Sequence, residues 1–116
     1  MNSYLDEDNY PTERTLAMIS NWSYMGGYEG YKKMMEIIRS IWAYCDCGYW
    51  KQYISVDKLS GDEYTYYQIS TAGWSGNESI VAVMHENKLF MANCWEQSRR
   101  GGHYLFRIKN ENTKTI

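Results

Sequence analysis

The fold of this chain depends on a ten-residue stretch, residues 69–78, which reads ISTAGWSGNE. It follows a segment with strand periodicity, contains two glycines and leads into a segment with helical periodicity. Asn77 is a suitable N-cap for that helix, and Glu78 favours its first turn, because side-chain oxygens and negative charge stabilise the free amides of a helix start. The stretch therefore predicts a strand-to-helix turn, a place where binding residues are common.

A β-hairpin is predicted just before this turn. Apolar and polar residues alternate from Trp50 to Asp57, residues 58–62 include a Ser-Gly-Asp turn signal, and residues 63–70 are rich in tyrosine and threonine. A period of two puts successive side chains on opposite faces of a strand. The two segments should therefore pair as antiparallel strands.

Two helices are predicted further upstream. Pro11 and Thr12 are typical of a helix start, with Thr12 as N-cap, and this helix should end near residues 21–24. The second, residues 28–45, has apolar residues every three or four positions and charged residues on the opposite side. Such an amphipathic helix should lie across an apolar surface.

The remaining segments complete one domain spanning residues 1–116. They are predicted as a helix over 78–86, a strand over 89–96, a loop over 97–102, a strand over 103–108 and a polar tail over 109–116. The predicted fold is α+β with the order ααββαββ. A four-stranded, mainly antiparallel sheet carries one long amphipathic helix on one face.

Composition limits the class of protein. With 116 residues, 44% of them hydrophobic, the chain is long enough for a single core. No apolar run approaches the roughly 18 residues of a membrane span, so no membrane partner is expected. The three cysteines are odd in number and follow no signal peptide, which predicts free thiols and a cytoplasmic location.

Charge is distributed unevenly around a net value of −2. Residues 1–10 form an acidic N-terminal arm, whereas residues 88–116 contain six basic and two acidic residues. This polarity steers anionic ligands toward the C-terminal half. Two solvated ends, or an acidic arm lying on a basic face, would explain it equally well. No broad basic field of the kind that binds duplex DNA is present.

Two segments carry the candidate binding residues. Gly73 and Gly76 permit close backbone approach before a helix start that attracts anions, and Trp74 is suited to stacking on a planar ligand. The alternative is that the turn simply requires these glycines and that Trp74 covers the core. Arg99 and Arg100, beside a Gly-Gly turn, resemble a phosphate clamp, or else a hairpin tip with arginines in water.

The predicted ligand-binding residues are Trp74, Ser75, Asn77, Ser98, Arg99, Arg100 and His103. They form one pocket only if the third strand runs parallel to the second, which brings both loops to the same end of the sheet. A crossover through a short helix is feasible, because nine helical residues span only about 13 Å. The sequence leaves both topologies open.

Other chemistry has less support. Zinc spacing is absent from the cysteines and histidines, so no metal and no cofactor are expected. A thiol–imidazole pair of Cys94 and His103 needs the two to align across strands, and Cys94 would otherwise pack as a small apolar residue. No spacing supports a general base at Glu78 or Glu96. No catalytic residue is assigned.

Residues 70–78, STAGWSGNE, and residues 94–106, CWEQSRRGGHYLF, resemble a set of small uncharacterised proteins of tailed bacteriophages and prophages. The resemblance covers roughly residues 63–108. It implies expression inside a bacterial host and brings no established activity or catalytic residue. Small phage proteins of this kind are often accessory factors that act on host machinery, including inhibitors of host defence.

Two functions from different classes follow. The first is a non-enzymatic phage accessory protein that binds an anionic, planar ligand, either nucleotide-like or a nucleic-acid backbone. The second is a protein–protein inhibitor or structural module that acts on a host protein through a surface rich in tyrosine and tryptophan, since aromatic residues and arginine dominate interface hot spots. An enzyme is a weaker third reading, and the sequence does not indicate an oligomeric state.

Overall fold

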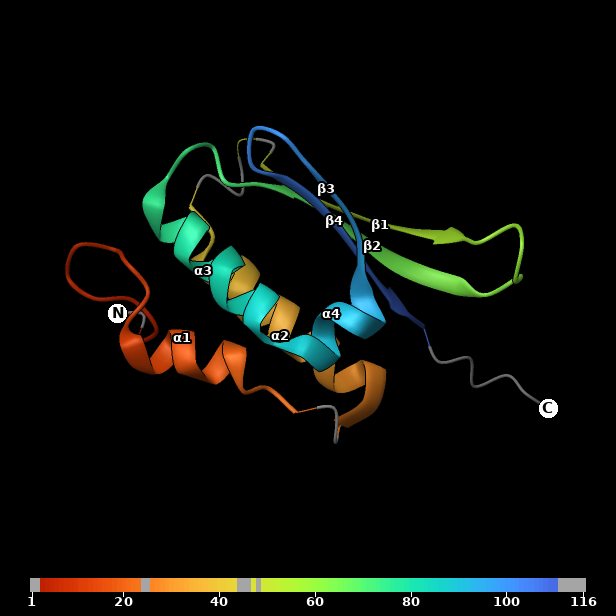
Figure 1. Ribbon diagram of the computed structural model, residues 1–116, viewed down its shortest axis with the longest axis horizontal. Helices are drawn as coiled ribbons and strands as arrows, with labels where there is room; N and C mark the ends of the chain where they lie inside the picture. The colour runs from red at the N-terminus through yellow and green to blue at the C-terminus, as the bar shows by residue number, and fades with distance from the viewer. Residues whose placement is uncertain (1–2, 24–25, 44–46, 48, 111–116) are drawn as a thin grey trace.

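The computed structural model describes residues 3–23, 26–43, 47 and 49–110 and shows an α+β fold (Figure 1). In chain order its elements are α1 (Glu13–Ser20), α2 (Gly27–Ile41), β1 (Trp50–Val56), β2 (Glu63–Ser70), α3 (Ser75–Glu86), α4 (Lys88–Cys94), β3 (Trp95–Arg99) and β4 (His103–Lys109). The second helix, predicted over residues 28–45, ends earlier, at Ile41, with Trp42 as its C-cap in an extended conformation. Residue 45 itself and the tail at 111–116 lie outside the described residues.

The four strands form one sheet in the order β1-β2-β4-β3, and every neighbouring pair is antiparallel. The predicted hairpin of β1 and β2 is confirmed, with Trp50 opposite Ile69. Because β2 and β3 are both antiparallel to β4, they run in the same direction. The segments that follow β2 and β3 therefore lie at the same end of the sheet.

The strand predicted over residues 89–96 is wrong. Residues 88–94 form α4, and β3 begins at Trp95 and includes residues 97–99, which were predicted as loop. Asn87 starts the helix, since its Oδ1 accepts a hydrogen bond from Phe90 N at 3.1 Å. Phe90 and Cys94, one helical turn apart, are the buried residues of α4. The order is therefore ααββααββ, with four helices instead of three in the described chain.

Of the two predicted N-caps, Thr12 of α1 is confirmed and Asn77 of α3 is wrong. Thr12 Oγ1 accepts from Thr15 N at 3.1 Å and caps α1. Helix α3, however, begins at Ser75 with Trp74 as its N-cap, so Asn77 lies inside the first turn. The side chain of Asn77 bonds to Ala43 and Thr71 instead of capping its own helix.

The helices α1 to α4 lie on one side of the sheet (Figure 1). The strand residues that face them are buried, as the alternating burial of β2 shows. In α2 the buried residues follow the predicted helical spacing: Tyr31, Met34, Met35, Ile38 and Ile41. Helices α2 and α4 contact β4, and α1 packs against α3. We call the helix-covered side the inner face and the opposite side the outer face.

No helix of the described chain covers the outer face (Figure 1). Near the β1–β2 turn this face is occupied by ion pairs, because Arg107 binds both Asp57 and Glu96 at 2.8 Å. The hydrogen bond from Arg107 holds the pKa of the Asp57 carboxyl below its usual value. The opposite end of the outer face, where β2 and β3 finish, carries the basic residues discussed next.

Candidate functional site

The segment after β2 and the turn after β3 are hydrogen-bonded to each other. Thr71 N donates to Gly102 O at 3.0 Å, and Ser70 Oγ is hydrogen-bonded to His103 Nδ1 at 2.5 Å. Gly102 has a φ of +81°, and a β-carbon added to it would overlap Thr71 Oγ1. Glycine is therefore required here, both for the backbone conformation and for the close approach of the two segments.

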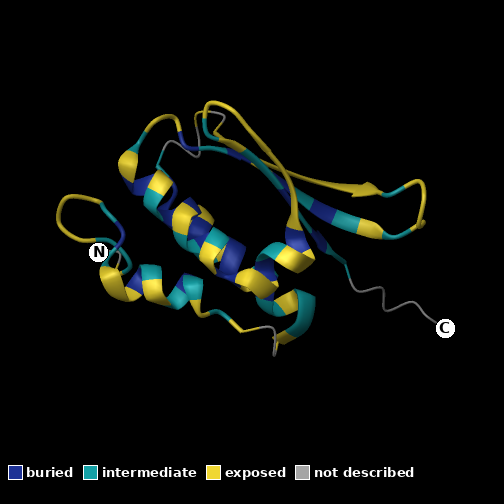
Figure 2. Cartoon of the chain, viewed as in Figure 1, coloured by how far each residue is buried: buried dark blue, intermediate teal, exposed yellow. Residues whose placement is uncertain are grey.

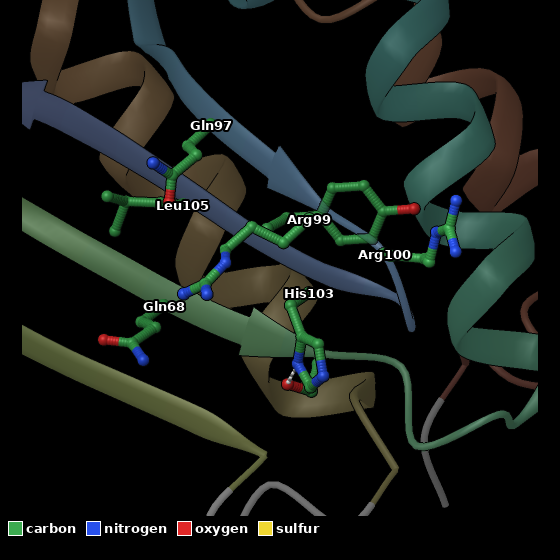
Figure 3. A pocket seen from close by; sticks show the side chains of 8 residues that line it. Gln68, Gln97, Arg99, Arg100, His103 and Leu105 are labelled. Atoms are coloured by element: carbon green, nitrogen blue, oxygen red, sulfur yellow. Dashed lines mark hydrogen bonds between the residues drawn. The ribbon is translucent and has the colours of Figure 1, made fainter.

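A cavity of about 450 Å³ opens beside this junction (Figure 3). Side chains from β2, β3, β4 and the β3–β4 turn line it: Gln68, Ser70, Gln97, Arg99, Arg100, His103, Tyr104 and Leu105. None of these described lining residues is acidic. The lining consists mainly of amides, guanidinium groups and an imidazole, which are suited to bind an anion with polar substituents.

The two adjacent arginines do not form a single clamp. In Figure 3 the Arg99 side chain extends over the sheet toward Gln68, whereas Arg100 points away from it. Adjacent residues at a strand end project to different sides, so two neighbouring guanidinium groups rarely converge on one ligand. Arg99 forms no ion pair in the part of the chain that the structure describes. It is the cation best placed for an anion in this cavity.

His103 contributes an imidazole to the cavity and comes from β4. Its register places it between Ser70 on β2 and Arg99 on β3. When Ser70 donates its hydroxyl proton to Nδ1, the ring proton is on Nε2, which then acts as a hydrogen-bond donor. The serine thus orients the imidazole beside Arg99.

Trp74 and Ser75 lie in another place. The rings of Trp74 and Tyr10 are 4.8 Å apart, and Tyr10 Oη is hydrogen-bonded to Ser75 Oγ at 2.7 Å. Trp74 lines a second hollow of about 350 Å³ that shares no lining residue with the first. These two residues hold the N-terminal arm, so the expected common pocket of Trp74 and Arg99 is not formed.

Ser98 and Asn77 also lie outside the cavity lining. Ser98 Oγ accepts a hydrogen bond from Trp95 Nε1 at 2.8 Å. Asn77 is 0% exposed, and its side-chain partners among the described residues are backbone groups of other segments. Of the seven predicted site residues, the structure brings together Arg99, Arg100 and His103.

Sequence reasoning missed the two glutamines of the cavity. Gln68 precedes Ser70 by two positions and therefore shares its face of β2, a signal that strand periodicity alone contains. Gln97 had no comparable signal, because residues 97–99 were predicted as loop. Its position opposite Leu105 follows from the pairing of β3 with β4.

The thiol–imidazole pair is not formed. Cys94 is buried in α4 on the inner side, and burial raises the pKa of its thiol to about 12, which keeps it protonated. Within the described residues, no three histidine, cysteine or acidic side chains are grouped to hold a metal ion. In the same part of the chain, no helix has the length and apolar character needed to cross a membrane.

A comparison of the chain with protein-family models, curated proteins and solved structures finds no match. A function for this chain must therefore be argued from the chemistry of its own residues. The cavity at the ends of β2 and β3 is a concave site with a basic lining that contains no acidic residue.

Proposed function

We propose that this protein is a non-enzymatic binding protein whose ligand carries phosphate, as a nucleotide or as a nucleic-acid backbone, and that the ligand occupies the cavity between Arg99 and His103. The observation that carries the proposal is a guanidinium without an ion-pair partner among the described residues, beside an oriented imidazole in a cavity without acidic lining. Guanidinium groups form short, charge-assisted hydrogen bonds with phosphate oxygens.

The charge pattern of the outer face supports an anionic ligand. Toward the β1–β2 turn, Arg107 and Lys109 are paired with carboxylates. Toward the cavity, Lys51 lies opposite Gln68, and neither Lys51 nor Arg99 has an ion-pair partner among the described residues. A local positive potential can attract an anion even though the whole chain has a net charge of −2.

The outer face also carries an aromatic pair that is suited to a longer ligand. Tyr53 and Tyr66 are cross-strand neighbours with rings stacked at 5.2 Å and 8°. Tyr66 is four residues from Ser70 along β2, about 13 Å at about 3.3 Å per residue. A mononucleotide held at Arg99 would not use these rings, whereas a short single strand could stack a base on them. Affinity should then rise with oligonucleotide length.

The test is a binding titration with inorganic phosphate, nucleoside mono- and triphosphates, and single-stranded oligonucleotides of increasing length. The variant Arg99→Ala should weaken binding about 10- to 100-fold, since one charge-assisted contact contributes about 1.5–3 kcal/mol. Arg14→Ala on α1, another exposed arginine, is the matched control and should leave affinity unchanged. Affinity that falls with salt would indicate phosphate contacts. Absence of binding to every probe, or equal loss in both variants, would contradict the proposal.

A second candidate is a host-protein interaction through exposed aromatic residues, as expected of a phage accessory protein. Trp95, at the start of the edge strand β3, is 45% exposed, and α4 just before it exposes Leu89. Tryptophan is strongly enriched among the residues that dominate protein interfaces. Binding to a host protein that is insensitive to salt and is lost in Trp95→Ala, with nucleotide binding unchanged, would favour this function over the first.

A further inference from the structure

Strand β1 lies at an edge of the sheet and presents unpaired backbone groups. Tyr49 O accepts from Ser70 N at 3.0 Å, and Asp57 N donates to Asp62 O at 2.8 Å. These two bonds show that the odd-numbered residues of this strand bond to β2. In an antiparallel ladder the residues between them point their N–H and C=O groups the other way. Gln52, Ile54 and Val56 therefore direct theirs away from β2, where the described chain supplies no further strand.

The same strand has few of the features that usually protect an edge. Its seven residues pair with β2 in one uninterrupted register without a bulge, and Lys51 is the only charged residue among them. Natural edge strands are commonly interrupted, shortened or charged, which prevents pairing with another chain. A long, regular and mostly uncharged edge is suited to pairing with another strand.

Apolar side chains accompany this free edge. The β1–β2 hairpin extends past the helices, and Figure 2 shows most of β1 as exposed. On its inner side Ile54 is 63% exposed and Val56 is 54% exposed, and Leu59 in the turn is 98% exposed. The hairpin therefore leaves both backbone and apolar groups uncovered at one place.

We propose that β1 pairs with β1 of a second copy of this chain, antiparallel about a two-fold axis at Ile54, to form a continuous eight-stranded sheet. The free groups belong to even-numbered residues, so the two-fold axis must pair even with even residues. With the axis at Ile54, the two Ile54 residues face each other, and Gln52 of each copy faces Val56 of the other. All of these residues have free backbone groups.

Charge selects this register among those the free groups permit. It places Lys51 of one copy opposite Asp57 of the other, and both are odd-numbered residues whose side chains lie on the outer face. Shifting the axis by one residue toward Tyr53 would place Lys51 opposite Ser55 instead. Opposite charges across neighbouring strands are stabilising, so the Ile54-centred pairing is preferred. A self-complementary surface of this kind is what a two-fold dimer requires.

Disulfide trapping tests the register. Residues facing each other in a hydrogen-bonded antiparallel pair have Cα atoms about 5.5 Å apart, within the roughly 4.4–6.8 Å that a disulfide needs. In a background with Cys45→Ser and Cys47→Ser, Ile54→Cys should form a covalent dimer under mild oxidation. Tyr53→Cys is the matched control, because Tyr53 is an exposed neighbour on the same strand. In the proposed register Tyr53 faces Ser55 of the other copy, so the two introduced thiols would not face each other. It should stay monomeric on a denaturing gel.

Light scattering and sedimentation of the unmodified chain complete the test. The full chain should have twice the mass of one copy, and Ile54→Lys should raise the dimer dissociation constant at least tenfold while its circular dichroism spectrum stays unchanged. Arg99→Ala should leave the dimer intact, so this result is independent of the proposed ligand site. A monomeric mass at millimolar concentration, a dimer that survives Ile54→Lys, or equal cross-linking of both cysteine variants would overturn the proposal.

Discussion

Asn77→Ala has an effect that can be worked out from the structure. Asn77 was predicted as a ligand-binding residue, but its side chain is buried and forms hydrogen bonds to the backbone of two other segments. Its Oδ1 accepts from Ala43 N at 3.0 Å, and its Nδ2 donates to Ala43 O at 3.2 Å and to Thr71 O at 3.3 Å. The side chain thus joins the start of α3 to the segment after α2 and to the segment after β2. All three bonds are lost in the variant.

The expected cost follows from these bonds. Each contributes about 1 kcal/mol net, and the groups left behind lose a partner, which gives about 3 kcal/mol in total. The higher helix propensity of alanine returns about 0.5 kcal/mol. Ala43 is only half-buried, so water can replace part of what it loses. The free energy of unfolding should therefore fall by about 2–3 kcal/mol, and the melting temperature by about 10 °C.

Urea unfolding followed by tryptophan fluorescence measures this change, with Asn93→Ala as the control. Asn93 is an exposed helical asparagine whose Nδ2 donates only to Leu89 O. That substitution should change stability by less than about 0.5 kcal/mol. A loss below about 1 kcal/mol in Asn77→Ala, or equal losses in both variants, would show that these buried bonds do not hold the segments together.

Three further results are expected. Gly102→Ala should lower the free energy of unfolding by about 2–3 kcal/mol, because positive φ costs about 1–2 kcal/mol and the new β-carbon also overlaps Thr71. Gly73 also has positive φ but has open space around it, so Gly73→Ala should lose only about 1–2 kcal/mol, from backbone strain, in the same urea assay. The Cys94 thiol, whose pKa burial raises to about 12, should resist iodoacetamide at pH 8 until the protein unfolds, and rapid native labelling seen by peptide mass spectrometry would refute its burial. The hydrogen bond from Arg107 lowers the pKa of Asp57 in the folded protein. The ion pair therefore stabilises the fold at pH values above the pKa of an unfolded aspartate, and this stabilisation is lost as the pH falls through the lower pKa of the folded state. The stability advantage of the wild type over Asp57→Asn should therefore shrink from pH 7 to pH 3, and a difference independent of pH would contradict the ion pair.

Local patterns in the sequence were sufficient for the elements whose residues contact mainly their neighbours in the chain. The alternation over β1 and β2 specified the hairpin, and Thr12 specified the start of α1, because strand period and capping act over a few residues. The same reasoning failed over residues 88–96. Consecutive apolar residues there fit either period, and burial of Phe90 and Cys94 on one side selects the helix.

The sequence alone predicted Arg99 and His103 as candidate ligand-binding residues, but could not show which side chains share a cavity. That depends on β4 lying between β2 and β3. The pairing of β2 with β4 joins residues more than thirty positions apart along the chain. Only tertiary structure decides such pairing, since it follows from burying one apolar face of the whole sheet. Tertiary structure also places Trp74 against Tyr10 and Asn77 in the interior, and among the described residues it leaves β1 at an edge of the sheet.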